Sequence, residues 1–295
     1  MLLLVFNRPA VVRELVAALR VNKPPVVYVA GDGPRTTHPA DTARCAEVRE
    51  VIARDIDWPC SVRTWFRETN VGLQRAVVSG IDWLFSHETA GVILEDDCLP
   101  APDFLPFAGA MLERYADTPS VMQISGVSMR SASTRSRESY HYAQVGHIWG
   151  WATWRRAWAQ YDPTLSTWPA VRDSYRRDPS SLRRALAAKF ASAHAGRKWT
   201  WSRAWYWSTV QQRGLSVIPS LNLIHNVGDG EDATHQHGAR HPLRRVHEEG
   251  LTWPLVHPPR LVTDDAYDQL LTRYHRGSFK QQLTERWWAL REQLA

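Results

Sequence analysis

The chain has 295 residues, of which 44% are hydrophobic and 22% are charged, and its mean hydropathy is -0.39. This composition is typical of a globular protein and excludes a fibrous, low-complexity or membrane-embedded chain. The formal charge of +6 suits an anionic small molecule, a membrane surface or a nucleic acid equally well, so charge alone selects no partner.

The start of the chain and its cysteines point to a reducing compartment. The first apolar run, residues 1–6, stops at Asn7, far short of the ~20 residues that cross a bilayer, so neither a signal peptide nor a transmembrane helix is predicted. Cys45, Cys60 and Cys98 form no CxxC pair and indicate neither a disulfide framework nor a zinc site. We therefore expect a cytoplasmic protein.

Strands and helices alternate along residues 1–125. Aliphatic and β-branched runs predict strands, and apolar residues at helical spacing predict helices, over 2–6 (strand), 11–19 (helix), 26–30 (strand), 40–53 (helix), 62–66 (strand), 74–85 (helix), 92–94 (strand), 104–115 (helix) and 121–125 (strand). This alternation predicts an α/β fold with a mostly parallel sheet and helices on both faces. Ligands of such sheets bind beyond the carboxyl ends of the strands. The polar residues at those ends are Asn7, Arg8, Asp32, Glu95, Asp96 and Asp97.

The alternation weakens in the second half, where tryptophans cluster at 149–158 and 199–207 around a basic helix predicted at 182–195. Flat aromatic side chains stack on sugars and bases, and filling a core is the alternative. Because we find no repeat and no long linker, we expect one domain. It would have a donor-binding half (1–125), an acceptor and catalytic half (126–278) and a C-terminal amphipathic helix (279–295).

Three adjacent carboxylates at the end of a buried strand, residues 95–97, are costly unless a cation or hydrogen-bond donors compensate them. Mg²⁺ and Mn²⁺ prefer oxygen ligands and are often held by one or two carboxylates together with substrate phosphates. An ordinary acidic turn is the alternative. The triplet therefore predicts Mn²⁺ or Mg²⁺ as the cofactor.

The stretch VILEDD at 92–97, followed by APDF at 101–104, resembles the acidic metal motif of nucleotide-sugar-dependent glycosyltransferases with the GT-A fold. The N-acetylglucosaminyltransferase I family has a similar EDD followed by APDFF. A group of bacterial glycosyltransferase-like proteins, some labelled hemolytic-protein-like, resembles the chain more widely. The shared segments, in chain order, are FNRP, DGPR, NVGL, LEDDCLP, GWATWRRAW and NLIHNVGDGEDATH. The resemblance covers about residues 2–240 and implies a GT-A, Rossmann-like sheet with an aromatic-rich acceptor half.

The resemblance also implies roles for individual residues. Those implied to line the nucleotide and donor-sugar pocket are Asn7, Arg8, Asp32, Asn70, Gly72, Arg75, Glu95, Asp96 and Trp151. An ordinary helix-start turn is the alternative at 70–72, and a packed core segment is the alternative at Trp151. Asp97 and His235 are implied to bind the metal, although the chain has 12 histidines and an isolated histidine is more often structural.

The catalytic base is where the chain departs from the family. N-acetylglucosaminyltransferase I has acidic residues between two tryptophans, one of them its base, whereas the matching stretch here, WSRAW at 201–205, has no carboxylate. An inverting transfer needs a base within about 3 Å of the acceptor hydroxyl, or one water away. The remaining candidates are Asp229, Glu231 and Asp232. We expect Asp232 to be the base, with Glu231 next.

These residues predict a glycosyltransferase that moves a sugar from a nucleoside diphosphate, with UDP as the expected nucleotide, to a hydroxyl of a glycan or lipid-linked acceptor. The main alternative is a protein that keeps the fold and binds carbohydrate or a partner without catalysis. A sugar nucleotidyltransferase would need a Gly-rich phosphate loop after the first strand, which Asn7-Arg8-Pro9 does not offer. Dispersed arginines without a known module disfavour nucleic acid, and contiguous acids are poor geometry for a glycoside hydrolase.

The tail at 279–294 predicts a helix with an apolar stripe formed by Leu283, Trp287, Leu290 and Leu294. Docking on its own domain is the expected role. A peripheral contact with the inner face of the membrane is the alternative, because the chain is basic and Trp287-Trp288 would favour the headgroup region.

Overall fold

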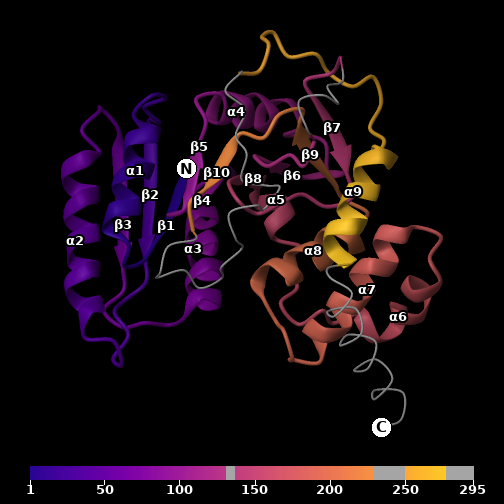
Figure 1. Ribbon diagram of the computed structural model, residues 1–295, viewed down its shortest axis with the longest axis horizontal. Helices are drawn as coiled ribbons and strands as arrows, with labels where there is room; N and C mark the ends of the chain where they lie inside the picture. Colours follow the sequence, from indigo (N-terminus) through magenta and orange to yellow (C-terminus); the bar gives the residue numbers. More distant parts are fainter. Residues whose placement is uncertain (131–136, 229–249, 277–295) are drawn as a thin grey trace.

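The computed structural model describes residues 1–130, 137–228 and 250–276, and Figure 1 shows the arrangement of its elements. The strands are β1 (Leu2–Val5), β2 (Val26–Gly31), β3 (Ser61–Phe66), β4 (Ala90–Glu95), β5 (Cys98–Pro100), β6 (Val121–Ser125), β7 (Tyr140–Ala143), β8 (Trp151–Trp154), β9 (Leu215–Pro219) and β10 (Ile224–Asn226). The helices are α1 (Pro9–Leu19), α2 (Ala40–Asp55), α3 (Leu73–His87), α4 (Phe104–Arg114), α5 (Arg155–Trp158), α6 (Trp168–Arg177), α7 (Ser181–His194), α8 (Trp201–Gln211) and α9 (Asp265–Arg276).

One eight-stranded sheet runs through the described residues in the order β3-β2-β1-β4-β8-β6-β9-β7. The strands β3, β2, β1 and β4 are all parallel, and β6 is parallel to β9. β8 runs antiparallel to both of its neighbours, and β7 runs antiparallel to β9. The predicted α/β fold with a mostly parallel sheet is therefore confirmed, and the sheet joins strands from both halves of the chain.

The strand order places a topological switch point between β1 and β4. The chain moves outward from β1 to β2 and β3, and then returns to β4 on the other side of β1. Because such crossovers are right-handed, this reversal puts α1 and α2 on one face and α3 on the other. Leu3 and Val5 accordingly pack in the core with α1 and α2, whereas Leu2 and Leu4 pack with α3. Ligands of parallel sheets bind in the crevice at such a point.

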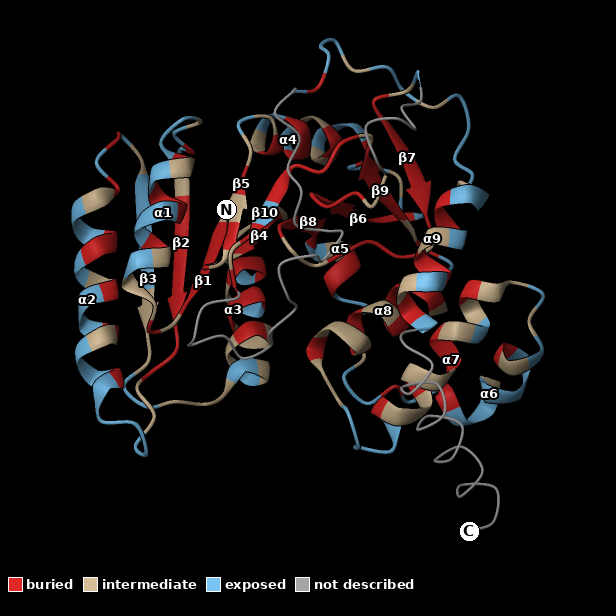
Figure 2. Cartoon of the chain, viewed as in Figure 1, coloured by how far each residue is buried: buried red, intermediate tan, exposed pale blue. Residues whose placement is uncertain are grey.

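The elements predicted in the first half are confirmed to within two residues at each end. Buried aliphatic runs explain this agreement, since Figure 2 shows β1, β2 and β4 buried and the edge strand β3 more exposed. The short strand β5 was not predicted, because its three residues are too few to carry a periodic pattern. It pairs with β10, far away in the sequence, in a separate two-stranded ribbon.

Most of the clustered tryptophans fill cores, which was the alternative to sugar stacking. Trp151, Trp158, Trp201 and Trp205 pack together on the α3 face of the sheet. The buried Trp205 indole donates from Nε1 to Gln123 Oε1 at 2.9 Å. A second core lies between α6, α7, α8 and α9. Trp149 and Trp199 differ, since each is only partly buried.

The described residues contain no helix that is both long and apolar enough to cross a bilayer. The predicted tail helix at 279–294 lies outside the described ranges, so its docking and its membrane contact stay predictions.

Candidate functional site

Glu95 ends β4, and Asp96 and Asp97 follow it at the switch point. Arg8, which follows β1, contacts Asp96 and Asp97 there. Asp96 is only 3% exposed. Arg8 donates from Nε to Asp96 Oδ2 at 3.3 Å, and its Nη2 contacts both Asp96 Oδ1 and Asp97 Oδ2, the latter at 3.1 Å. The sequence predicted that a cation or hydrogen-bond donors would compensate these acids. Among the described residues, a guanidinium supplies that compensation.

Burial and mutual repulsion change the protonation of these acids. Burial, reinforced by the charges of Asp97 and Asp96, raises the pKa of Glu95 to about 8, although the side chain is partly exposed. Burial also raises the pKa of Asp96 to about 6, against the opposing effect of Arg8. Burial and the neighbouring negative charges thus favour the protonated forms of Glu95 and Asp96, and Arg8 opposes this effect.

The β5–β10 ribbon brings the segment around Asn226 against Asp97. Asn226 lies opposite Cys98 in the ribbon and donates from Nδ2 to Asp97 Oδ1 at 3.2 Å. The backbone N–H of Val227 donates to the backbone oxygen of Asp97 at 2.9 Å. Gly228 is so close that a Cβ built on it would lie 2.4 Å from Asp97 Oδ2 and 3.0 Å from Asn226 Oδ1. A side chain at residue 228 would therefore collide with these two oxygen atoms, which is why glycine fits beside them.

The oxygen atoms of Asp97 and Asn226 are of the chemical type that binds a hard divalent cation. Mg²⁺ and Mn²⁺ prefer such oxygen atoms, and they commonly bind one or two carboxylates plus substrate phosphates. Within the described ranges, no group of three or more His, Cys, Asp or Glu side chains could hold a metal by itself. Of the two predicted ligands, Asp97 lies beside Asn226 and Gly228, and His235 lies outside the described residues. The predicted catalytic residues Glu231 and Asp232 also lie outside them.

The Gly228→Ala variant tests whether the position of the Asp97 carboxylate matters for metal binding. The added methyl group would displace the Asp97 carboxylate, and disturbing the surroundings of a metal ligand typically costs about 10–100-fold in metal affinity or activity. We expect a loss of that size in Mn²⁺ affinity, measured by calorimetry. The matched control is Gly109→Ala on α4, where a Cβ would meet nothing within 4 Å. Wild-type Mn²⁺ affinity in Gly228→Ala would contradict the assignment.

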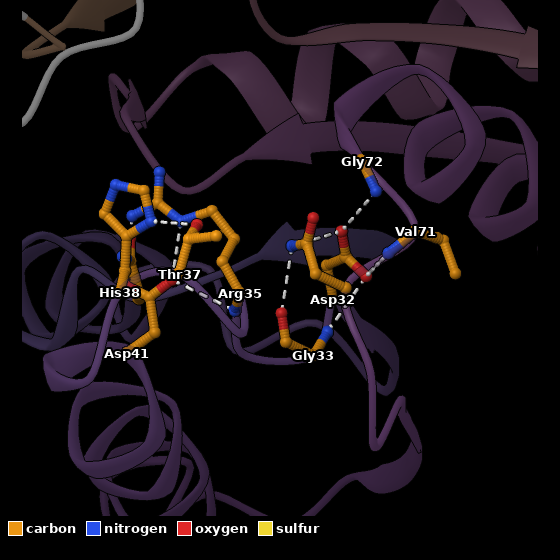
Figure 3. Close-up of polar contacts among 10 residues, drawn as sticks. Asp32, Gly33, Arg35, Thr37, His38, Asp41, Val71 and Gly72 are labelled. Atoms are coloured by element: carbon orange, nitrogen blue, oxygen red, sulfur yellow. Dashed lines mark hydrogen bonds and ion pairs between the residues drawn. The ribbon is translucent and has the colours of Figure 1, made fainter.

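Both carboxylate oxygens of Asp32 accept hydrogen bonds that hold the turn before α3 (Figure 3). Oδ1 accepts from the backbone N–H groups of Gly33 at 2.9 Å and Val71 at 3.0 Å. Oδ2 accepts from Asn70 Nδ2 at 2.9 Å and from the Gly72 N–H at 3.1 Å. Gly72 has a φ of 84°, a conformation that favours glycine. Asp32, Asn70 and Gly72 thus meet at the predicted site, where Asp32 shapes the loop.

Asn7 and Arg75, which were also predicted to line the donor pocket, form no hydrogen bond or ion pair with residues 95–97 within the described part of the chain. Asn7 is buried and donates from Nδ2 to Asp41 Oδ1 at 2.7 Å. Arg75 is exposed on α3, beside a cavity of about 310 Å³ whose lining includes Trp65, Arg67, Gln74, Arg75, Pro163 and Trp199.

Trp151 does not present the surface that a sugar wall needs. It is 1% exposed and stacks on Trp201 with ring centroids 5.9 Å apart. Trp151 is therefore a core residue, which was the alternative to a role in the sugar pocket. Trp201 and Trp205, which bound the stretch without a carboxylate, are buried in α8 as well. That stretch is part of the core rather than of the site.

Sequence reasoning missed Asp41, Asn226 and Gly228. Asn226 and Gly228 belong to the NLIHNVGDGEDATH segment, and the order of motifs that the chain shares with the resembling proteins was the signal that placed this segment near the acids. Asp41 had no such signal, because an aspartate in the first turn of a helix is ordinary.

No protein-family model and no curated protein sequence matches the chain. Among solved structures, the chain is similar to a UDP-glucose pyrophosphorylase complexed with UDP-glucose, at 9% identity and a TM-score of 0.37, over 74% of this chain and 89% of that one. It is also similar to a mannose-1-phosphate geranyltransferase from Thermus thermophilus, at 13% identity and a TM-score of 0.32, over 76% and 73% of the two chains. Similarity at this level carries no inference about the activity of this chain.

Proposed function

We propose that the chain is a metal-dependent glycosyltransferase, which moves a sugar from a nucleoside diphosphate, with UDP as the expected nucleotide, to a hydroxyl of a glycan or lipid-linked acceptor with inversion. The observation that carries this proposal is the convergence of Asp97 at the end of β4 with Asn226 and Gly228 beyond β10. A carboxylate oxygen and an amide oxygen lying together at the switch point of a parallel sheet support a metal site there. The resemblance of its motif order to that of such enzymes supports the proposed reaction class.

The roles of the residues follow from this arrangement. Asp97 and the amide oxygen of Asn226 would hold Mn²⁺ or Mg²⁺, which when bound neutralises the diphosphate leaving group. Arg8 holds Asp96 and Asp97 in place. The acceptor oxygen forms a bond to the anomeric carbon while the bond between that carbon and the diphosphate breaks. The acceptor proton passes to a carboxylate, for which we retain Asp232, followed by Glu231.

Donor hydrolysis tests the proposal. Purified protein is incubated with UDP-glucose, UDP-galactose and UDP-N-acetylglucosamine, with Mn²⁺ or with EDTA, and the released UDP is measured. We expect UDP release from at least one donor with Mn²⁺ and none with EDTA. UDP binding without release from any donor, even with a mixed-glycan acceptor pool, would favour the alternative of a carbohydrate- or partner-binding protein. That outcome would contradict the proposed catalysis.

The Asp232→Asn variant tests the base. Asparagine keeps the shape of the side chain but cannot take the proton, so kcat should fall by about 10²-fold or more while UDP affinity stays near normal. Glu231→Gln is the matched variant and should lose much less. If Asp232→Asn kept the wild-type kcat, the base would have to be Glu231, Asp229 or another residue.

A further inference from the structure

A cavity of about 300 Å³ lies between the turn that joins α6 to α7 and the end of α8. Asp178 and Arg183 line it from the turn and from α7, and Arg213 and Leu215 line it from the segment after α8. Leu215 begins β9, and β9 runs in the same direction as β4. The cavity therefore lies at the opposite edge of the sheet from Asp97 and is separate from the proposed metal site.

Asp178 holds Arg183 at one side of this cavity. Its Oδ2 accepts from Arg183 Nη1 at 3.3 Å, and its Oδ1 accepts from the backbone N–H of Ser180 at 2.8 Å. Arg183 Nε also donates to Gln144 Oε1 at 3.3 Å. Asp178 is the one carboxylate among the described residues of the lining, so the charges of Asp178 and Arg183 match each other.

Arg213 brings a second guanidinium to the cavity. Its side chain is exposed, and within the described ranges it forms no hydrogen bond or ion pair. Burial raises the pKa of Tyr175, and the charges of Arg183 and Arg213 both oppose this rise, so both guanidinium groups lie near the same ring. Because Asp178 already matches Arg183, the lining carries one positive charge in excess.

The backbone at Arg213 suits glycine better than arginine. Arg213 follows the residue that caps the end of α8, and its φ is 53°. Glycine is the residue most often found at this position, because an L side chain in this conformation costs free energy. No described side chain offsets that cost through a contact with the guanidinium, whereas an anion bound in the cavity would offset it.

The cavity also lies in the most basic part of the chain. Ten of the 36 lysines and arginines, but only two of the 30 acidic residues, fall within residues 168–213, which span α6, α7 and α8. Such a concentration of one charge raises the local concentration of ions of the opposite sign. A ligand of this cavity is therefore expected to be an anion.

We infer that the cavity is a binding site for a phosphomonoester, held between Arg183 and Arg213. A phosphomonoester carries about −1.5 to −2 charges at neutral pH and three acceptor oxygens, so it can bind two guanidinium groups at once. A carboxylate, with one charge, needs only one of them. The volume is at the lower end of those that hold small molecules, which suits a sugar phosphate or a lipid phosphate headgroup. This inference goes beyond the proposed function and does not depend on it.

Calorimetric titration of the full chain with glucose 6-phosphate tests the inference. About 0.15 M salt is used, because it screens exposed charges. Glucuronate, a sugar carboxylate of similar size, is titrated in parallel. Cosedimentation with phosphatidylcholine vesicles, with and without phosphatidic acid, distinguishes a lipid headgroup from a free phosphomonoester.

Two variants remove the guanidinium of residue 213, namely Arg213→Gln and Arg213→Gly. Arg172→Gln is the matched control, because Arg172 lies on α6 in the same basic segment, is 55% exposed and does not line the cavity.

We expect glucose 6-phosphate to bind the wild-type protein and Arg172→Gln equally, and to bind both Arg213 variants about tenfold or more weakly, the loss typical of removing a charged hydrogen bond. Arg213→Gly should melt close to the wild-type temperature, because glycine suits the backbone there. Binding to phosphatidic acid in place of glucose 6-phosphate, with the same dependence on Arg213, would assign the phosphomonoester to a lipid.

Four outcomes would overturn the inference. Unchanged affinity in Arg213→Gln would show that its guanidinium is not used, and an equal loss in Arg172→Gln would show attraction by the basic segment as a whole. Equal affinity for glucuronate would exclude a phosphomonoester as the specific ligand. Failure of the wild-type protein to bind either glucose 6-phosphate or phosphatidic acid would show that the cavity holds no phosphomonoester. None of these outcomes bears on the proposed site at Asp97.

Discussion

Replacing Asp97 with asparagine is expected to lower Mn²⁺-dependent UDP release by about 10³-fold or more, because a bound metal supplies several kcal/mol of charge stabilisation and each 1.36 kcal/mol is tenfold in rate. The fold should be nearly unaffected. Asparagine keeps an oxygen to accept from Asn226 Nδ2, and the change removes one of the carboxylates that crowd Asp96.

UDP release and the melting temperature are measured for Asp97→Asn together with Asp57→Asn. Asp57 is an exposed aspartate paired with Arg20, so its variant controls for the loss of one acidic charge. Asp57→Asn should retain full activity. Wild-type release and metal dependence in Asp97→Asn would show that Asp97 does not hold the metal.

Replacing Arg8 with glutamine is expected to produce the largest loss of stability among single changes at the site. It leaves Asp96 buried with a charge that has lost its partner, and breaking one side of a buried ion pair typically costs about 3–5 kcal/mol. For a chain of this size, about 2 °C per kcal/mol predicts a melting temperature lower by roughly 6–10 °C. Differential scanning calorimetry measures this shift.

The loss in Arg8→Gln should depend on pH. The pKa of Asp96 is already raised to about 6 in the folded protein, and without Arg8 it rises further. A carboxyl whose pKa is higher in the folded state takes up a proton on folding, so acid favours the folded variant. The difference from wild type should therefore be smaller near pH 5 than near pH 8, since below the folded pKa Asp96 is neutral and needs no partner.

Arg20→Gln is the matched control for this variant, because Arg20, at the other end of α1, is also paired with an aspartate but is exposed. Exposed pairs contribute about 0–1 kcal/mol, so its melting temperature should change little at either pH. An Arg8→Gln variant as stable as Arg20→Gln would contradict the role given to the Arg8–Asp96 pair.

The first half of the fold could be predicted from the sequence because its signals are local. Aliphatic runs such as residues 2–5 and 26–31 report burial on both faces of a parallel sheet, and polar residues at their ends mark the edge where a site forms. The acidic triplet could be placed at that edge for the same reason. The need for a cation near the triplet also followed from the three negative charges of residues 95–97.

The contacts that complete the site could not be predicted in this way. The pairing of β5 with β10 joins residues 98–100 to 224–226, and strands of three residues carry too short a pattern to reveal a partner. The contact of Arg8 with Asp96 spans 88 residues, and nothing in FNRP distinguishes an arginine that binds acids from one that binds phosphate. The role of Trp151 could not be decided from the sequence, because aromatic residues are found both in cores and in sugar-binding sites.

Calorimetric titration of the wild-type protein with UDP, in Mn²⁺ and again in EDTA, tests whether the end of β4 is a metal-dependent nucleotide site. We predict saturable binding with Mn²⁺ that weakens about tenfold or more in EDTA, since Asp97 would hold the ion and the ion would neutralise the diphosphate. Equal affinity in EDTA, or no binding of UDP, GDP, CDP, ADP or dTDP with Mn²⁺, would contradict it.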